Sequence, residues 1–207
     1  MERQNRKKKR SEIIRLFCVL LPVMLGSYFL TKWIRFGYGP FYPQLGIDRA
    51  VPFFPPFILI YIGSFVSWFA GFCMLVRYSE ADLYEFSAAA LLCFAVSAAV
   101  YILYPVEIVR PDASGSGLWL WLVRFIYAVD TPQNLFPSMH CMLSWLYYTA
   151  IRGKKAYPAA LRIGWLIFAV LVFASTLFVK QHYFVDFLGA VALAEIGMWI
   201  SRRRNWG

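Results

Sequence analysis

Residues 159–179 read AALRIGWLIFAVLVFASTLFV, and the only charged side chain in this run is Arg162. An α-helix needs roughly 20 mostly apolar residues to cross the hydrocarbon core of a bilayer. Comparable apolar runs lie near 14–34, 55–76, 86–106, 137–151 and 183–201. The sequence therefore predicts an all-α integral membrane bundle with six membrane-spanning helices.

The composition of the chain agrees with a membrane environment. Apolar residues make up 60% of the chain and charged residues 15%, whereas soluble domains hold about 25% charged residues. The run at 137–151 is short and Pro22 interrupts the first run, so a five-span fold with one re-entrant segment is a second interpretation. We expect two parts, a basic cytoplasmic tail at 1–11 and one membrane domain at 12–207.

Basic residues predict which side of the membrane each end occupies. Six of them precede the first apolar run: Arg3, Arg6, Lys7, Lys8, Lys9 and Arg10. Cytoplasmic loops carry an excess of lysine and arginine, and six spans would place 15 of the 21 basic residues on one side, including those of RGKKAYPAALR (152–162) and SRRR (201–204). We therefore expect both termini in the cytoplasm and a first span that is retained rather than cleaved.

The net charge of +10 then reflects topology, and we expect no nucleic-acid partner.

Two loops on the predicted outer side are rich in aromatic residues. The first, TKWIRFGYGPFYPQLGIDRAVPFFPP (31–56), is too broken by proline and glycine for a span, and we expect it to lie along the interface as a belt or cap. The second (105–136) contains GLWLWLVRFIYAVD, which predicts an interfacial helix. The four cysteines fall within predicted spans without a C-x-x-C pair, so we expect no disulfide and no thiolate metal site.

Polar residues from three separate spans converge on one predicted membrane face. The stretch KQHYFVD (180–186) places Lys180, His182 and Asp186 at the outer start of the last span. NLFPSMH places His140 at the outer start of the fourth span, and Arg110 lies just beyond the outer end of the third. The two histidines are the only ones in the chain. Because both are expected at the same membrane face, we predict a functional site there.

The spacing of His182 and Asp186 suggests a chemical pair. Residues four apart share one face of a helix, so the carboxylate is able to accept a hydrogen bond from the imidazole. That bond would fix the tautomer and leave the second ring nitrogen as a nucleophile or a metal ligand. Aspartate within a span costs on the order of 2.5–3.5 kcal/mol at the helix centre, so it needs a partner. Taken alone, the pair also fits a structural hydrogen bond.

The residues before His140 fit an anion site. Pro137 suits a helix start, Ser138 offers a hydroxyl group, and the free N–H groups of a first helical turn attract anions. Arg110 and Lys180 add positive charge. Singly, these two cations also fit interfacial anchors, and the serine fits an ordinary helix start. Together with the histidines they favour a phosphate site over a cation site.

Three motifs carry a family resemblance. RP (110–111), PSMH (137–140) and STLFVKQHYFVD (175–186) resemble, in order, the three signatures of the type 2 phosphatidate phosphatase superfamily. The resemblance covers the second half of the chain and implies a six-helix membrane fold that needs no metal or other cofactor. It implies that His182 is the nucleophile, Asp186 orients it, His140 is the acid and Arg110 holds the phosphate.

The chain departs from the family pattern at three positions. Leu103 and Thr176 stand where the family usually has lysine and arginine, and Met139 stands where it usually has glycine. Lys180 is the candidate to replace one of the two missing cations. The segments DTPQNLFPSMH and KQHYFVD are similar to the branch that includes inositol phosphorylceramide and sphingomyelin synthases.

The resemblance and the residues together predict a membrane lipid phosphatase. We expect it to hydrolyse a lipid phosphate monoester or diphosphate, such as phosphatidate or an isoprenoid diphosphate, through a phosphohistidine at the outer face of a bacterial plasma membrane. The alternative is a lipid phosphotransferase that moves a phospho-alcohol head group between lipids. We expect the head-group pocket in the loops at 32–55 and 112–130, and only a bracing role for Asp130 and Asn134.

Two other classes of function fit some of these residues. A zinc hydrolase would use His140, His182 and Asp186 as ligands, but Arg110 and Lys180 would repel the metal. A transporter or scaffold would keep the polar cluster as a binding site. Transporters, however, usually hold ionisable residues near the bilayer midplane rather than at one rim.

Overall fold

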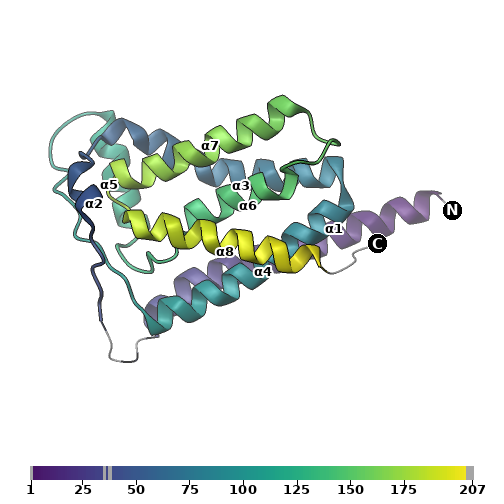
Figure 1. Cartoon of the computed structure of the whole chain (residues 1–207), viewed down its shortest axis with the longest axis horizontal. Helices are drawn as coiled ribbons and strands as arrows, with labels where there is room; N and C mark the ends of the chain where they lie inside the picture. The colour runs from purple at the N-terminus through teal and green to yellow at the C-terminus, as the bar shows by residue number, and fades with distance from the viewer. Residues whose placement is uncertain (1, 35, 37–38, 204–207) are drawn as a thin grey trace.

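The structure is a computed structural model that describes residues 2–34, 36 and 39–203, with side chains from residue 10 onward. Within these residues the chain is helical, apart from loops and one isolated β-bridge between Phe41 and Val106 (Figure 1). The α-helices are α1 (Glu2–Phe29), α2 (Gly46–Ala50), α3 (Ile58–Tyr78), α4 (Glu80–Leu103), α5 (Leu118–Val129), α6 (Met139–Ile151), α7 (Ala159–Phe178) and α8 (Phe184–Arg202). Two 3-10 turns, η1 (Leu30–Trp33) and η2 (Pro55–Phe57), follow α1 and precede α3.

Five of the helical segments are long and apolar enough to cross a membrane. They are Arg10–Trp33, Pro55–Tyr78, Glu80–Leu103, Ala159–Phe178 and Phe184–Arg202. These segments coincide with five of the six apolar runs in the sequence. The prediction of a helical membrane bundle is therefore confirmed, with five candidate spans.

The sixth apolar run, at 137–151, forms α6. Its 13 residues extend for roughly 20 Å, which is less than the ~30 Å hydrocarbon core of a bilayer. The helix lies inside the bundle and packs on α3, α4, α7 and α8. All but two of its residues are buried, so α6 forms the centre of the core and its polar side chains are shielded from lipid.

Two helices begin earlier than the apolar pattern predicts. Ser79 caps α4, because its Oγ atom accepts a hydrogen bond of 3.2 Å from the backbone N–H of Asp82, and α4 therefore starts at Glu80 rather than at residue 86. α1 starts at Glu2 and continues through Pro22 without a break. Lysine, arginine and glutamate are strong helix formers, so the predicted basic tail continues the first span as helix. Residue 1 of that tail, and Arg204 of the terminal SRRR, lie outside the described residues.

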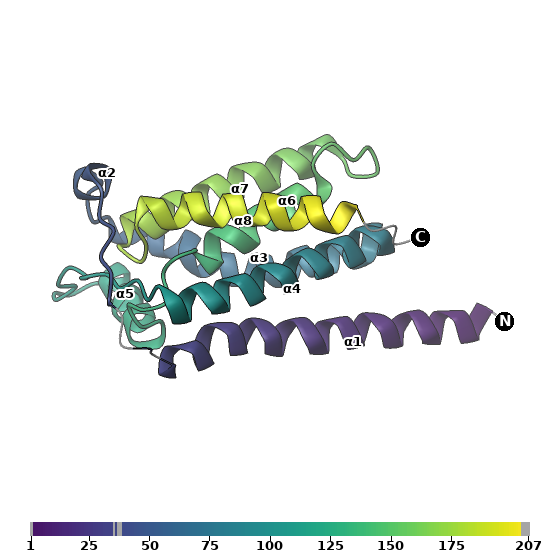
Figure 2. The ribbon, with the colours of Figure 1, turned by 60° about the horizontal axis from the view of Figure 1, so that its bottom comes forward.

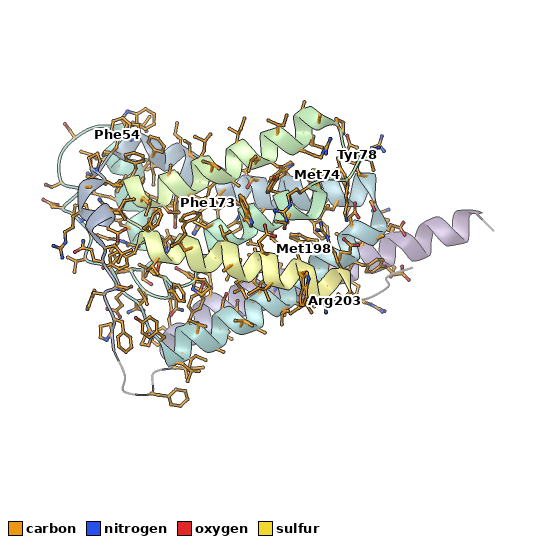
Figure 3. All side chains as sticks on the ribbon, in the orientation of Figure 1. Phe54, Met74, Tyr78, Phe173, Met198 and Arg203 are labelled. Atoms are coloured by element: carbon orange, nitrogen blue, oxygen red, sulfur yellow. The ribbon has the colours of Figure 1, made fainter. Side chains whose placement is uncertain are left out.

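The loops between the helices gather at one end of the bundle, which we call the loop-rich end. It holds α2, α5 and the segments 39–54 and 104–117 (Figures 1 and 2). The start of α1, the turn at 152–158 and the end of α8 lie at the opposite end (Figure 1). In Figure 3, Phe54 marks the loop-rich end, and Tyr78 and Arg203 mark the other. α5 is the helix that the sequence predicts within 117–130.

Candidate active site

The turn between α7 and α8 lies at the loop-rich end and carries His182. The backbone N–H of Lys180 donates to the carbonyl group of Leu177 at 3.2 Å. That of Gln181 donates to Thr176 at 2.9 Å, and the two bonds together form a Schellman motif. Lys180 takes the left-handed position of the motif at φ 52°, where glycine is usual. The left-handed conformation of a non-glycine residue costs on the order of 1 kcal/mol or more, so the backbone at Lys180 is strained.

His182 and Asp186 form the predicted pair. Nδ1 of His182 lies 3.2 Å from Oδ2 of Asp186. The same oxygen accepts a 2.8 Å hydrogen bond from the backbone N–H of Tyr183, so the carboxylate also secures the first turn of α8. Asp186 is 0% exposed and His182 is 7% exposed. Because Nδ1 faces the carboxylate, Nε2 is the ring nitrogen left for chemistry.

The start of α6 is fixed against α8. The backbone N–H of Ser138 donates to the carbonyl group of Asp186 at 3.1 Å. Phe136 packs so closely on Gly189 that a Cβ atom there would stand 2.4 Å from Cε2 of the ring. The hydroxyl group of Tyr101 donates to the carbonyl group of Pro137 at 2.8 Å. These contacts place the first turn of α6 beside the first turn of α8.

Ser138 is the N-cap residue of α6. Its Oγ atom accepts a 3.4 Å hydrogen bond from the backbone N–H of Cys141, and the side chain is fully buried. The hydroxyl group therefore contributes to the helix start. Its direct contact with a phosphate stays a prediction.

The two histidines lie together. The centroids of the His140 and His182 rings are 6.0 Å apart, with 59° between the ring planes. Nε2 of His140 is buried and has no hydrogen-bond partner among the described residues. Because a hydrogen bond spans about 2.7–3.2 Å, one phosphate group between the rings is able to contact both.

Aromatic side chains of α3 hold the His140 ring. The Tyr61 ring is tilted by 31° against it, with ring centroids 4.2 Å apart. Phe65 meets it edge to face at 5.0 Å, and Trp68 lies at 5.2 Å. The hydroxyl group of Tyr61 is 3.4 Å from Nδ1 of His140. The ring is therefore fixed by packing rather than by a carboxylate in direct contact.

Asp130 is a further carboxylate near the pair, and the sequence assigned it only a bracing role. It accepts hydrogen bonds from the hydroxyl groups of Tyr28 and, at 2.5 Å, Tyr61. Burial opposes its ionisation, but His140, the two hydroxyl groups and His182 outweigh burial and hold the pKa of the Asp130 carboxyl below its usual value. The Asp130 carboxylate is therefore negatively charged, and the hydroxyl group of Tyr61 links it to His140.

Arg110 reaches the site from the extended segment that follows α4. Its guanidinium group donates to the carbonyl groups of Tyr127, at 3.1 Å, and Asp130, at 2.6 Å, and to the side-chain oxygen of Gln181. It also lies over the Tyr127 ring at 4.4 Å. The Nε atom is buried without a hydrogen-bond partner among the described residues, and this N–H is a donor available to an anion.

Lys180 joins the site to the segment 39–54. Its ammonium group donates to the carbonyl groups of Asp48 at 2.9 Å and Val51 at 2.5 Å. The carboxylate of Asp48 in turn accepts a 2.7 Å hydrogen bond from the backbone N–H of Phe184. Burial lowers the pKa of the Lys180 amine. These contacts hold residues 48–51 against the turn that carries His182.

A cavity of about 440 Å³ opens beside His182. Three cations line it, Arg49, Arg110 and Lys180, together with Gln44, Asp48 and Tyr183. A pocket of this size suits a small molecule or a head group. The expected head-group loop at 32–55 does line this cavity, whereas no residue of the loop at 112–130 does so.

Sequence reasoning missed Arg49, Gln181 and the roles of Asp130, Tyr28 and Tyr61. One usable signal was the position of Asp130 at the end of an apolar helix, because a carboxylate there needs a partner. Gln181 lies inside the motif that was singled out. The tyrosines carried no signal, since they sit within ordinary apolar spans.

The arrangement is suited to nucleophilic chemistry on an anion. A carboxylate orients one imidazole, the centroid of a second imidazole ring lies 6.0 Å away, and cations line the cavity beside the first. The residues that the structure describes include no group of three or more histidine, cysteine, aspartate or glutamate side chains able to hold a metal ion. The chain matches no protein-family model, no curated protein and no solved structure. The function is therefore argued from the site itself.

Proposed function

We propose that the chain is a membrane lipid phosphatase that acts through a covalent phosphohistidine on His182. One observation carries the proposal: the His140 and His182 rings lie 6.0 Å apart, and Asp186 holds Nδ1 of His182 at 3.2 Å. The resemblance of the three motifs to the type 2 phosphatidate phosphatase superfamily supports it. The substrate is a lipid phosphate monoester or diphosphate of the phosphatidate or isoprenoid type.

In the first step, Nε2 of His182 attacks the terminal phosphorus and forms an N–P bond, while the bond breaks to the ester oxygen of a monoester or to the bridging oxygen of a diphosphate. His140, protonated, gives its proton to this departing oxygen, so the leaving group is the lipid alcohol from a monoester or the lipid monophosphate from a diphosphate. Asp186 stabilises the positive charge that develops on the His182 ring. Asp130 favours the protonated form of His140.

In the second step, His140 is neutral and accepts a proton from water. The water oxygen attacks phosphorus, the N–P bond breaks, and inorganic phosphate leaves. His182 returns to its neutral state and His140 is protonated again, so the cycle closes without a metal or another cofactor. Arg110 and Lys180 neutralise the charge on the phosphate oxygens, which is the main requirement of phosphoryl transfer. Arg49 extends this positive lining.

We also propose a topology of six crossings, with both termini in the cytoplasm and the site at the outer face of a bacterial plasma membrane. α6 follows the loop-rich end in the chain and leads to the turn at 152–158 at the opposite end (Figure 1). The segment that includes α6 therefore completes the sixth crossing inside the bundle. The excess of basic residues at the end opposite to the site supports this orientation.

A second candidate function is transfer of a phospho-alcohol head group from one lipid to another. The cavity of about 440 Å³ beside His182 favours it, because this volume exceeds what a bare phosphate needs. The resemblance to the phosphorylceramide-synthase branch points the same way. In this reaction a lipid hydroxyl group replaces water in the second step.

One experiment tests the proposal and separates the two reactions. The purified protein is incubated with a panel of phospholipids and isoprenoid diphosphates, and both free phosphate and new lipids are recorded. Free phosphate alone identifies a phosphatase, and a new phospholipid identifies a transferase. His182→Ala and His140→Ala should abolish turnover while the protein remains in the membrane. Full activity in either variant would contradict the assignment.

A further inference from the structure

His140 lines a second cavity, which His182 does not line. This cavity, of about 100 Å³, lies between α1, α3 and α6, and its lining is apolar apart from a few groups that include His140 and Asp130. Leu25 of α1 and Phe65 of α3 form part of its wall. His182 thus lines a polar, cationic cavity, and His140 lines an apolar one.

The apolar cavity continues along the helices. Met24, Phe65 and Trp68 line both this cavity and the next one, of about 160 Å³, which Leu21 and Phe17 also line. We call the two together the α1–α3 groove. Its floor includes residues of α4 and α6. α1 packs on α4 along one side of the bundle (Figure 2), which leaves the groove between α1 and α3.

The groove has the length and polarity of a lipid chain site. Along α1 it extends from Phe29 to Phe17, or roughly 18 Å at 1.5 Å per residue. One leaflet of a bilayer contributes about half of the ~30 Å hydrocarbon core. The Phe17 ring narrows the far end, where it packs edge to face on Phe72 at 5.3 Å, and a further apolar cavity begins on its other side. Both walls belong to candidate spans, so the surrounding medium is hydrocarbon.

We infer that one hydrocarbon chain of the lipid substrate lies in the α1–α3 groove, with its phosphate between His140 and His182. This inference rests on the proposed function and deepens it. An amphiphile whose phosphate occupies the histidine pair presents its charged end to the cavity lined by Arg49, Arg110 and Lys180. Its apolar end then meets the groove, which begins at His140. His140 lines the groove, so the groove reaches the histidine pair, and this contact identifies the occupant as the substrate's own chain.

The inference predicts that a bulky side chain halfway along the groove selects against long chains. Leu21 lines the groove and Val23 lines neither of its cavities, yet both side chains belong to α1 and both are 38% exposed. Leu21→Trp and Val23→Trp are therefore a matched pair. Each variant is assayed in detergent with phosphatidate that carries either hexanoyl or palmitoyl chains, and the ratio of kcat/KM for the long lipid to that for the short lipid is measured.

We expect Leu21→Trp to lower this ratio by about tenfold or more and Val23→Trp to leave it unchanged. Release of phosphate from the short lipid reports that a variant has folded. An equal effect of the two variants, or an unchanged ratio in Leu21→Trp, would overturn the groove assignment while the proposed function stands.

If the wild-type protein released no phosphate from either lipid or from the isoprenoid panel, the proposed function itself would fail. A shift of Leu21→Trp to a smaller oligomer on size exclusion would show that a second copy covers the groove, which also overturns the inference.

Discussion

The hydroxyl group of Tyr61 donates a 2.5 Å hydrogen bond to Oδ2 of Asp130. The same hydroxyl group lies 3.4 Å from Nδ1 of His140, and Tyr28 donates to the other oxygen of Asp130. The two histidines are therefore supported differently. His182 contacts its carboxylate directly, whereas His140 is linked to one through a tyrosine of a neighbouring span. This difference suits a pair in which one ring is a nucleophile and the other exchanges a proton.

Asp130 and Tyr61 are positioning residues in this account, so their removal should change the pH profile as well as the rate. We expect Asp130→Asn and Tyr61→Phe each to lower kcat about tenfold, or ~1.4 kcal/mol in the activation barrier. The first step needs neutral His182 and protonated His140, so the rate should follow a bell-shaped pH profile. Asp130→Asn removes the negative charge that favours protonated His140, so the alkaline limb of this profile should move to lower pH.

A matched control for this prediction lies at the opposite end of the bundle. Tyr157 is also buried and donates a 2.7 Å hydrogen bond to Asp82. Tyr157→Phe removes an equivalent bond and should leave the pH profile in place. A profile that is the same in Asp130→Asn as in the wild-type protein would show that Asp130 only braces the loop.

Gly189 sets the distance between α6 and α8 near the site. A Cβ atom there would stand 2.4 Å from Phe136, so Gly189→Ala must displace the aromatic ring that precedes Pro137. We expect a cost of about 1–3 kcal/mol in unfolding free energy, as for other overpacked sites, together with lower kcat. Thermal unfolding in detergent and phosphate release measure the two effects.

Gly164 of α7 provides the comparison, because a Cβ atom there meets nothing within 4 Å. Gly164→Ala should therefore be neutral or slightly stabilising, since alanine is the better helix former. Equal thermal stability of the two alanine variants would contradict the close packing at Phe136.

Lys180 combines a strained backbone with a partly buried ammonium group, and two substitutions separate these contributions. Lys180→Met and Lys180→Gly both remove the cation and its bonds to Asp48 and Val51, so both should raise KM for the lipid phosphate. Only glycine relieves the left-handed conformation at φ 52°. We expect the free energy of unfolding of Lys180→Gly to be about 1 kcal/mol higher than that of Lys180→Met. The reverse order of stability would argue against this turn geometry.

Chelation distinguishes the proposed reaction from a zinc hydrolase that uses His140, His182 and Asp186. In the proposed reaction these groups act as base, nucleophile and orienting carboxylate, so EDTA or phenanthroline should leave phosphate release unchanged. The measurement is the rate before and after dialysis against chelator. Loss of activity that zinc restores would favour the metal-dependent reaction.

The sequence predicted the positions of the long helices because a bilayer imposes a simple rule of length and polarity. It predicted their ends less well. α4 starts early because Ser79 caps it, and α1 extends back through the basic tail. These boundaries depend on capping and helix propensity rather than on apolar content.

The site was predictable where its residues share a motif. His182 and Asp186 are four residues apart on one helix, so their contact follows from helical geometry. The link from Asp130 through Tyr61 to His140 joins segments far apart in the chain, and no local pattern encodes it. Arg49 belongs to a loop whose fold depends on Lys180, so its place beside the cavity required the tertiary structure.

The most direct test of the central claim is to trap the covalent intermediate. The protein is mixed with a lipid phosphate that carries radiolabelled phosphorus, quenched in alkali to preserve phosphoramidate bonds, and digested for peptide mapping. The account predicts an alkali-stable, acid-labile label on His182 that is absent from His182→Ala. Turnover of the lipid with the label on another residue, or without labelled protein, would contradict the claim that His182 is the nucleophile.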